Sequence, residues 1–397
     1  MRSILTFLLS LTLAGPALAV DGVLEINQTC AVNTGCFSGD TAGFPVTIDG
    51  SAGSSYILTG DLTVPDENTS GVLVSSSYIT VDLGGHSVIG PVVCGGTPTV
   101  CSSSGTGRGV STTAVNGVRI RNGTVRGFGD IGVGTNASGS IEDVASIGNA
   151  GIGIFVGPIS TVDRSKAVAN GGDGIAGANW VRISNSASVV NAGDGILVGN
   201  ESIVSNNTVT QNEGRGIAAG DRSQISGNIV IAIGSRGITG DVDLTISNNT
   251  VDSSPSTTRG IVVSRGVITD NVVRGGMTGI SGMGAITRNV VIGASFRGIS
   301  LSQSGSFTNN HRLESNLVTD CETGVGISVS DTRIIYMRDN NLRDNEISLS
   351  IQNLGGGSAE IIAGGNLIVG RTADISGSHT FVPISCNRVG STTVCPP

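Results

Sequence analysis

A column of polar and charged residues recurs at a regular spacing through the middle of the chain. Each member directly precedes a Gly-Ile dipeptide: Asp173, Asp194, Arg215, Arg236, Arg259, Thr278 and Arg297. If these positions stack on one another, several guanidinium groups line one edge and repel by on the order of 1 kcal/mol per neighbouring pair. Because guanidinium groups pair with carboxylates in a bidentate fashion, the column predicts an edge that binds an acidic polymer. The alternative is a solvated ladder paired with its own carboxylates and carbonyls.

A second set of residues is acidic and lies after the same repeats. Asp221, Asp241 and Asp243 continue a series that begins with Asn179 and Asn200. Oxygen ligands on neighbouring repeats are the kind that calcium prefers, so one interpretation of the three aspartates is a calcium site. Asn and Asp are also common turn residues, which is the competing interpretation. No other cofactor is indicated.

Three single residues are weaker candidates. Lys166, the only lysine, lies near Arg164 and is expected to be an exposed side chain rather than a base. His86 is expected to be structural. Cys321 has no neighbouring His or Asp pattern that would activate a thiolate, so we expect a buried structural thiol.

These residues lie on a repeat that must position them. Gly residues of the Gly-Ile or Gly-Val dipeptide stand at 132, 153, 174, 195, 216 and 237, each 21 residues after the last, and continue at 260, 279, 298 and 326. Two columns of Asn share this period. The first is Asn149, Asn170, Asn191 and Asn212; the second is Asn207, Asn228, Asn249, Asn271, Asn289, Asn316, Asn341 and Asn366. We expect the Asn side chains to bond to the backbone of adjacent turns.

The repeat has the composition of a parallel β-helix. Apolar residues alternate over two or three positions, which is strand spacing, and Asn and Gly separate them at turns. Leucine-rich repeats share the period but need a Leu framework that is sparse here. The prediction is therefore an all-β, single-stranded right-handed parallel β-helix of about 21-residue rungs with caps at both ends. Ten to thirteen rungs spaced by roughly 4.8 Å would form a rod on the order of 50–65 Å long.

The two ends of the chain lack the 21-residue period of the repeats. Residues 1–19 contain Arg2, the apolar run Ile4–Ala14 and Ala17-Leu18-Ala19, which predicts a signal peptide and a secreted or periplasmic protein. Residues 20–50 are expected to form an N-terminal cap, 51–370 the β-helix, and 371–397 a last rung and C-terminal cap. No later segment is apolar over a length that could span a membrane.

Six of the seven cysteines form short-range pairs that predict disulfides in an exported chain. They are Cys30 with Cys36, Cys94 with Cys101, and Cys386 with Cys395. Zinc is the alternative, but the spacing between cysteines and the three His residues fit it poorly.

Composition excludes several classes of protein. Gly accounts for 62 of 397 residues while only 3% are aromatic, so the core must be built from Val and Ile. Collagen is excluded because Gly shows no every-third-residue register and Pro numbers only 10. The net charge of −8, with one lysine, argues against nucleic acid as the partner.

Two segments carry a resemblance to a known group. Tyr78-Ile-Thr-Val-Asp-Leu-Gly-Gly-His-Ser-Val-Ile-Gly, which follows Tyr56-Ile-Leu-Thr-Gly-Asp-Leu-Thr-Val, and Arg121-Asn-Gly-Thr-Val-Arg-Gly-Phe128 resemble the opening rungs of secreted bacterial right-handed parallel β-helix proteins. The resemblance implies the fold and export over nearly the whole mature chain, but most members of the group have no assigned activity. Wider relatives by fold include pectate lyases, polygalacturonases, alginate epimerases and phage tailspikes.

The catalytic motifs of those wider relatives do not occur in the sequence. The chain lacks the Asn-Thr-Asp, Asp-Asp and Gly-His-Gly segments of polygalacturonases, the Asp-Pro-His-Asp of alginate epimerases and the Arg-x-Pro-x-x-Arg of pectate lyases. The catalytic residues are therefore unknown. We expect binding of an acidic extracellular or cell-surface polysaccharide; the alternatives are a pectate-lyase-like polysaccharide lyase and a structural or adhesive rod.

Overall fold

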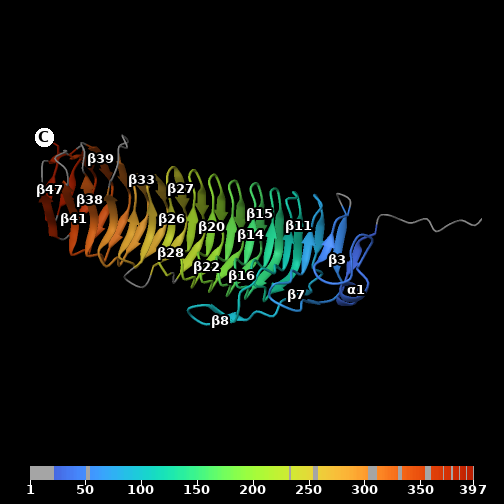
Figure 1. The fold of residues 1–397 in the computed structure, drawn as a ribbon. Helices are drawn as coiled ribbons and strands as arrows, with labels where there is room; N and C mark the ends of the chain where they lie inside the picture. Colours follow the sequence, from blue (N-terminus) through green and yellow to red (C-terminus); the bar gives the residue numbers. More distant parts are fainter. Residues whose placement is uncertain are drawn as a thin grey trace, which may run out of the picture.

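The computed structural model describes residues 22–50, 54–231, 234–253, 258–302, 311–329, 333–353, 359–369, 371–376, 379–383, 385–389 and 391–396. The predicted signal peptide lies outside these residues. The chain forms a right-handed parallel β-helix, seen as an elongated rod in Figure 1. The predicted fold is thus confirmed, but the expected ten to thirteen rungs are too few, since the sheet that takes one strand from each turn has 15 strands in the described residues.

Most turns of the rod contribute one strand to one sheet and two short strands to another, and at Arg119–Arg126 and Ser140–Ile147 the two short strands are replaced by one long strand. In the described part of the chain the first sheet, here called sheet B, has 15 strands, and the second, sheet A, has 30. The strands of sheet B are β2 (Val46–Ile48), β5 (Val72–Val74), β10 (Val110–Thr112), β12 (Val133–Thr135), β14 (Ile154–Val156), β17 (Ile175–Gly177), β20 (Ile196–Val198), β23 (Ile217–Ala219), β26 (Arg236–Gly240), β29 (Arg259–Val263), β32 (Thr278–Ser281), β35 (Arg297–Ser302), β38 (Thr323–Val329), β41 (Ile347–Asn353) and β44 (Arg371–Ser376).

Sheet A receives two short strands from most turns. Its strands are β1 (Leu24–Ile26), β3 (Ser55–Leu58), β4 (Leu62–Thr63), β6 (Thr80–Asp82), β7 (Ser87–Ile89), β11 (Arg119–Arg126), β13 (Ser140–Ile147), β15 (Thr161–Asp163), β16 (Lys166–Val168), β18 (Arg182–Ser184), β19 (Ala187–Val189), β21 (Ile203–Ser205), β22 (Thr208–Thr210), β24 (Gln224–Ser226), β25 (Ile229–Ile231), β27 (Leu244–Ser247), β28 (Thr250–Asp252), β30 (Gly266–Thr269), β31 (Val272–Arg274), β33 (Gly284–Thr287), β34 (Val290–Ile292), β36 (His311–Glu314), β37 (Leu317–Thr319), β39 (Arg333–Arg338), β40 (Asn341–Arg343), β42 (Ala359–Gly364), β43 (Leu367–Ile368), β45 (His379–Pro383), β46 (Asn387–Val389) and β47 (Thr392–Val394).

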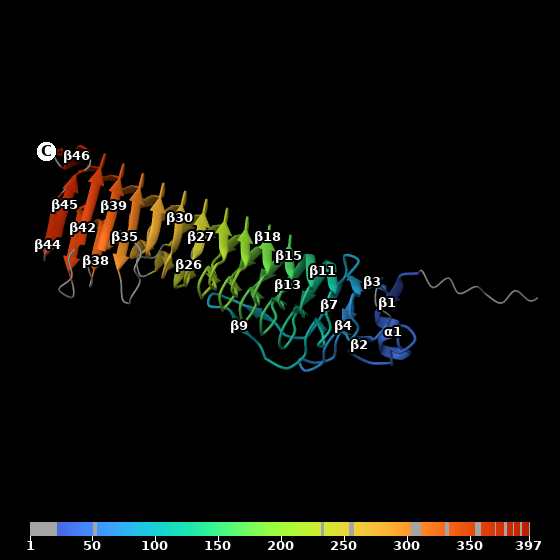
Figure 2. The same ribbon diagram turned by 90° about the horizontal axis from the view of Figure 1, so that it is seen from above.

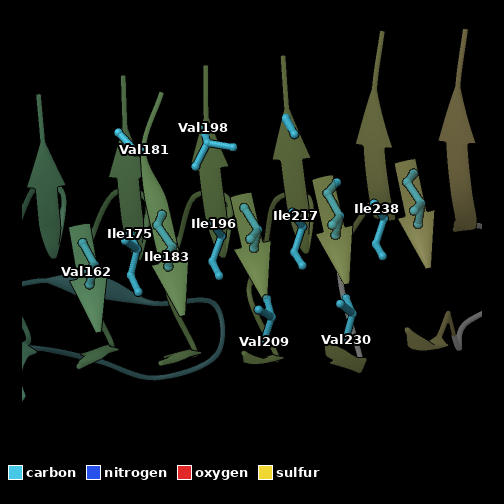
Figure 3. Close-up of a cluster of buried hydrophobic side chains, with 14 of the residues drawn as sticks. Val162, Ile175, Val181, Ile183, Ile196, Val198, Val209, Ile217, Val230 and Ile238 are labelled. Carbon is cyan, nitrogen blue, oxygen red and sulfur yellow. The ribbon is translucent and has the colours of Figure 1, made fainter. Parts of the chain in front are cut away.

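The core is a stack of Val and Ile columns, because a parallel register places the same position of each turn one strand spacing apart. On sheet B, Ile175 pairs with Ile196, which pairs with Ile217, and all three are fully buried. Figure 3 shows these residues pointing inward opposite Val162 and Ile183 of sheet A. The shortage of aromatic residues follows from this narrow interior.

The Gly of each Gly-Ile pair is required where the chain turns into sheet B. A Cβ placed on Gly195 would lie 2.3 Å from Cγ1 of Val209 and 2.7 Å from the carbonyl oxygen of Gly216. Any larger residue would therefore displace the core or the next turn, which explains why the dipeptide recurs from Gly132 to Gly298. The assignment of Gly326 to this column was wrong, because Ile299 pairs with Val325 and Ser300 with Gly326, so Gly324 takes the place.

Asn side chains form two buried ladders at the turns. In the longer one, Asn207 donates its backbone N–H to Oδ1 of Asn228 (2.9 Å), and Asn228 does the same to Asn249 (2.9 Å). Each side-chain amide also donates to a backbone carbonyl of the preceding turn, as Asn228 Nδ2 does to Val204 (3.0 Å). The ladder thus satisfies polar groups that the turns bury.

The ladder departs from the sequence prediction near its end. Asn316 donates to Oδ1 of Asn340 (3.1 Å), and Asn340 donates to Oδ1 of Asn366 (3.0 Å). The assignment of Asn341 to this column was wrong, because Asn341 begins strand β40 and its backbone N–H bonds to Asn316 O (2.8 Å). Asn387 extends the ladder by one more turn.

All three predicted cysteine pairs are disulfide-bonded, and Cys321 is free and buried. Helix α1 (Gln28–Asn33) lies at the N-terminal end of the rod, beside the Cys30–Cys36 bridge (Figure 1). At the other end, β46 and β47 pair antiparallel and close with Cys386–Cys395. No helix in the described residues has the length and apolar character needed to cross a bilayer.

The Cys94–Cys101 segment leaves the rod and lies along its side. Its strands β8 (Cys94–Gly95) and β9 (Val100–Cys101) form an antiparallel hairpin, here called the hairpin strap (Figure 2). At its tip, Thr99 donates to the carbonyl of Val190 (2.7 Å) and to the carboxylate of Glu213. The strap therefore contacts turns that lie far along the chain from its own.

Candidate functional site

The predicted arginine column lies along the edge of sheet B where each strand begins. Arg236 stands beside Arg259 in the parallel register, and Arg259 beside Thr278, which stands beside Arg297. Neighbouring members are separated by one strand spacing, about 4.8 Å. The structure thus brings these residues together in the order in which the sequence repeats them.

The residues at the acidic end of the column form hydrogen bonds with one another. Asp194 donates its backbone N–H to Oδ1 of Asp173 (2.7 Å), and Arg215 donates its backbone N–H to Oδ1 of Asp194 (2.7 Å). The guanidinium of Arg215 also donates two hydrogen bonds to the Asp194 carboxylate, from Nε to Oδ2 (3.0 Å) and from Nη2 to Oδ2 (2.6 Å). Arg215 is therefore neutralised within the protein.

The pKa values of Asp173 and Arg215 are both raised, for different reasons. Loss of solvation raises the pKa of Asp173, and the nearby negative charge of Asp194 adds to the rise. The hydrogen bonds from Arg215 to Asp194 raise the pKa of the guanidinium, with smaller contributions from the charges of Asp173 and Asp241.

Arg236 and Arg259 differ from Arg215 in having no carboxylate partner within ion-pair distance among the described residues. Arg236 is exposed and Arg259 is half-buried. Further along, the guanidinium of Arg297 lies 4.8 Å from the ring of Phe296, and its side chain passes over Gly326. The part of the column that can accept an anion is therefore centred on Arg236 and Arg259.

The outer face of sheet B lies beside this column. Its outward positions are mostly small: Leu73, Ser111, Gly134, Phe155, Ala176, Leu197, Ala218, Thr239, Val262, Ser281 and Ser300 follow one another in register. Several of the small residues, such as Ala218 and Thr239, are almost fully buried, so the half-buried Leu197 and Val262 form more of the surface beside the arginines.

The predicted calcium residues occupy the opposite edge of sheet B and beyond. Asp221 continues an amide ladder from Asn200, whose Oδ1 accepts from the Asp221 N–H (3.0 Å), and Asp221 Oδ1 accepts from Val242 N (3.1 Å). Asp243 instead pairs with Arg265 (2.7 Å). Over the described ranges no group of three or more His, Cys, Asp or Glu residues is placed to hold a metal ion. Calcium binding at Asp221, Asp241 and Asp243 stays a prediction.

One site residue escaped the sequence prediction. Arg108 precedes Gly109-Val110 and belongs to the same column as Arg236, three turns before Asp173. The residues of the strap precede it and interrupt the regular period, which hid the match. Arg108 lies at a hollow of about 270 Å³ on the outer face of sheet B, and Phe155 lies at the same hollow.

The three single candidates lie apart from this face. Burial raises the pKa of the Cys321 thiol, and backbone hydrogen bonds only partly offset the rise. His86 Nδ1 lies 3.5 Å from Asp61, and Lys166 is exposed on β16. None of them contacts the arginine column or the hollow.

Comparison with known proteins shows structural similarity at low sequence identity. No family model matches the chain, and no curated protein does so. Among solved structures, the chain is similar to the A-module of the Azotobacter vinelandii mannuronan C-5 epimerase AlgE6 (14% identity, TM-score 0.44, 87% of this chain and 91% of that one). It is also similar to the pectate lyase Pel9A (14%, 0.33, 90% and 76%). A third similar structure is the Dettilon tailspike protein (15%, 0.41, 84% of this chain), of which the chain spans 62%.

Proposed function

We propose that the protein is exported and binds an acidic polysaccharide along the outer face of sheet B. The observation that carries the proposal is the adjacent pair Arg236 and Arg259, which stand in register without a carboxylate partner among the described residues. Guanidinium groups on neighbouring strands repel, by on the order of 1 kcal/mol in water where they approach to about 4–5 Å. A bound polyanion relieves this repulsion.

The shape of the face suits a polymer better than a small anion. The outward positions beside the arginines recur at every turn, so this face runs parallel to the axis of the rod. A polymer with a carboxylate on each unit can present successive charges to successive turns. Bidentate contacts from arginine to carboxylate then fix its direction along the rod.

The test compares two double variants with the same change in net charge. Arg236→Ala/Arg259→Ala removes the free pair, whereas Arg222→Ala/Arg288→Ala removes two exposed arginines that pair with Glu201 and Asp270 away from this face. Affinity electrophoresis in gels containing polygalacturonate, alginate or neutral dextran, at low ionic strength, measures retention.

The first variant should bind the acidic polymers at least roughly tenfold more weakly, a loss of about 1.4 kcal/mol, while the control keeps its retention. Equal losses in both variants, or none in the first, would refute the proposal. Ultraviolet absorbance of the same mixtures tests the lyase alternative, because cleavage by elimination creates absorbing unsaturated ends.

A further inference from the structure

The hollow on sheet B exists because one outward position lacks a side chain. Gly134 lies in register with Ser111 on one side and Phe155 on the other. A Cβ on Gly134 would meet only Cγ2 of Ile131, at 3.6 Å, so the space above this glycine is open. The hollow of about 270 Å³ is smaller than the sites that take drug-sized ligands. It has room for one sugar ring.

The walls of the hollow combine an apolar surface with a few polar groups. Phe155 is half-buried and forms part of the wall on the turn after Gly134. Ser111 and Asn136 add polar side chains, and the Asn136 backbone N–H is held by the hydroxyl of Thr112 (3.0 Å). One aromatic wall with a small number of placed polar groups is the usual composition of a ligand site.

Arg108 supplies the guanidinium. It contacts its carboxylate partner Asp130 through Nε alone, whereas Arg215 contacts Asp194 through both Nε and Nη2. The Nε of Arg108 donates to Oδ2 of Asp130 (2.8 Å), and nearly half of the Arg108 side chain (46%) is exposed. A guanidinium has five N–H donors, so this single bond orients Arg108 and leaves donors for a ligand. No other arginine or lysine lines the hollow among the described residues.

We propose that this hollow is a subsite for one hexuronate unit, with Phe155 against the apolar face of the pyranose ring and Arg108 paired with the carboxylate. The inference rests on the proposed function, since it places the end of the bound polysaccharide on the same face of sheet B. It predicts that a free hexuronate binds to the protein even without the rest of the polymer.

The experiment uses sodium D-galacturonate as the probe and D-galactose as its uncharged counterpart. Saturation-transfer NMR on the intact protein should show galacturonate binding with a Kd on the order of 1 mM, as for a ligand of this size. Galactose should bind at least roughly fivefold more weakly, because it cannot pair with Arg108. Equal binding of the two sugars would overturn the assignment.

Gly134→Leu fills the hollow without touching the core, because Leu73 and Leu197 occupy the same outward column. It should abolish the galacturonate signal, and Phe155→Ala should weaken it at least tenfold. Thr208→Leu adds the same side chain to an exposed position of sheet A, between Ala187 and Ile229, and should bind as the wild type does. Unchanged binding in Gly134→Leu would refute the subsite.

The two proposals fail separately. If galacturonate does not bind but Arg236→Ala/Arg259→Ala loses polymer retention, the subsite is refuted and the proposed function stands. If galacturonate binding is lost in Gly134→Leu while the arginine pair has no effect on polymer retention, the subsite stands and the extended binding face is refuted.

Discussion

Asp194 binds Arg215 twice, through the backbone N–H and through the guanidinium of the same residue. The contact crosses from one turn of the β-helix to the next, so it depends on the 21-residue register and not on neighbours in sequence. It divides the column of residues that precede Gly-Ile into two parts. In the first the charges pair with one another, and in the second, which begins at Arg236, the arginines have no carboxylate partner among the described residues.

Asp194→Asn should increase the affinity for acidic polymers. The Asn Oδ1 still accepts the Arg215 N–H, but the guanidinium loses its ionised partner and joins Arg236 and Arg259 as a third free cation. We expect roughly three- to tenfold tighter retention, up to about 1.4 kcal/mol, by affinity electrophoresis. Glu201→Gln frees Arg222 elsewhere with the same charge change and should have no effect; equal tightening would point to net charge alone.

Asn228→Ala should strongly destabilise the fold. The fully buried Asn228 accepts from both nitrogens of Asn207 and donates to Val204 and Asn249. Its loss leaves several buried groups unsatisfied, and we expect a cost of roughly 3–5 kcal/mol in the free energy of unfolding.

Urea unfolding followed by Trp180 fluorescence measures this cost. Asn200→Ala is the matched control, because Asn200 belongs to the more exposed amide ladder and its Oδ1 accepts one bond, from Asp221 N. That variant should lose about 1 kcal/mol. Similar losses at the two positions would contradict a special role for the buried ladder.

Asp173→Asn should stabilise the protein at neutral pH and have no effect in acid. Burial raises the pKa of Asp173 in the folded state, so the stability associated with this group is present below the unfolded pKa and is lost as pH rises through the folded pKa. The Asn variant keeps the acceptor for Asp194 N–H and avoids that loss. Its Tm should exceed that of the wild type at pH 7 and equal it at about pH 3.

Asp270→Asn should change the stability at neutral pH in the opposite direction. The hydrogen bond from Arg288 lowers the pKa of Asp270, so its contribution to stability is present above the unfolded pKa and is lost as pH falls through the folded pKa. This variant should have a lower Tm than the wild type at pH 7, and the difference should vanish in acid. The same sign for both variants would exclude burial as the cause at Asp173.

Thr135→Val should stabilise the rod. The Thr135 hydroxyl is buried and has no hydrogen-bond partner among the described residues, and it faces the turn at Gly139. The next turn has Val156 at the same position. Removing an unsatisfied buried hydroxyl while keeping the shape should add about 1 kcal/mol to the free energy of unfolding. Urea unfolding checks this, and a loss would imply that the hydroxyl has a partner in solution.

The sequence repeats were sufficient to predict the fold because each rests on a steric or hydrogen-bonding requirement. The position of Gly195 is glycine in successive repeats because no Cβ fits beside Val209 and Gly216. The position of Asn228 is asparagine because the buried turn needs both a hydrogen-bond acceptor and a donor. Such requirements repeat with the turns and therefore appear as a period in the sequence.

The site was only partly predictable. Stacking of the arginine column followed from the period, but the pairing that removes Arg215 from it depends on side-chain geometry between turns. Arg108 was missed because the strap interrupts the period before it. The hollow arises from the contrast between Gly134 and Phe155 on adjacent turns, and a single small residue among many glycines gives no signal.

The hairpin strap has a mechanical consequence. Successive turns of a solenoid contact only their neighbours, so tension along the axis would normally separate them one at a time. The strap connects its own base, closed by Cys94–Cys101, to Val190 and Glu213, which lie on different turns. These turns cannot separate unless the strap detaches first. Under tension along the axis, this stretch of the rod therefore resists extension as a single unit.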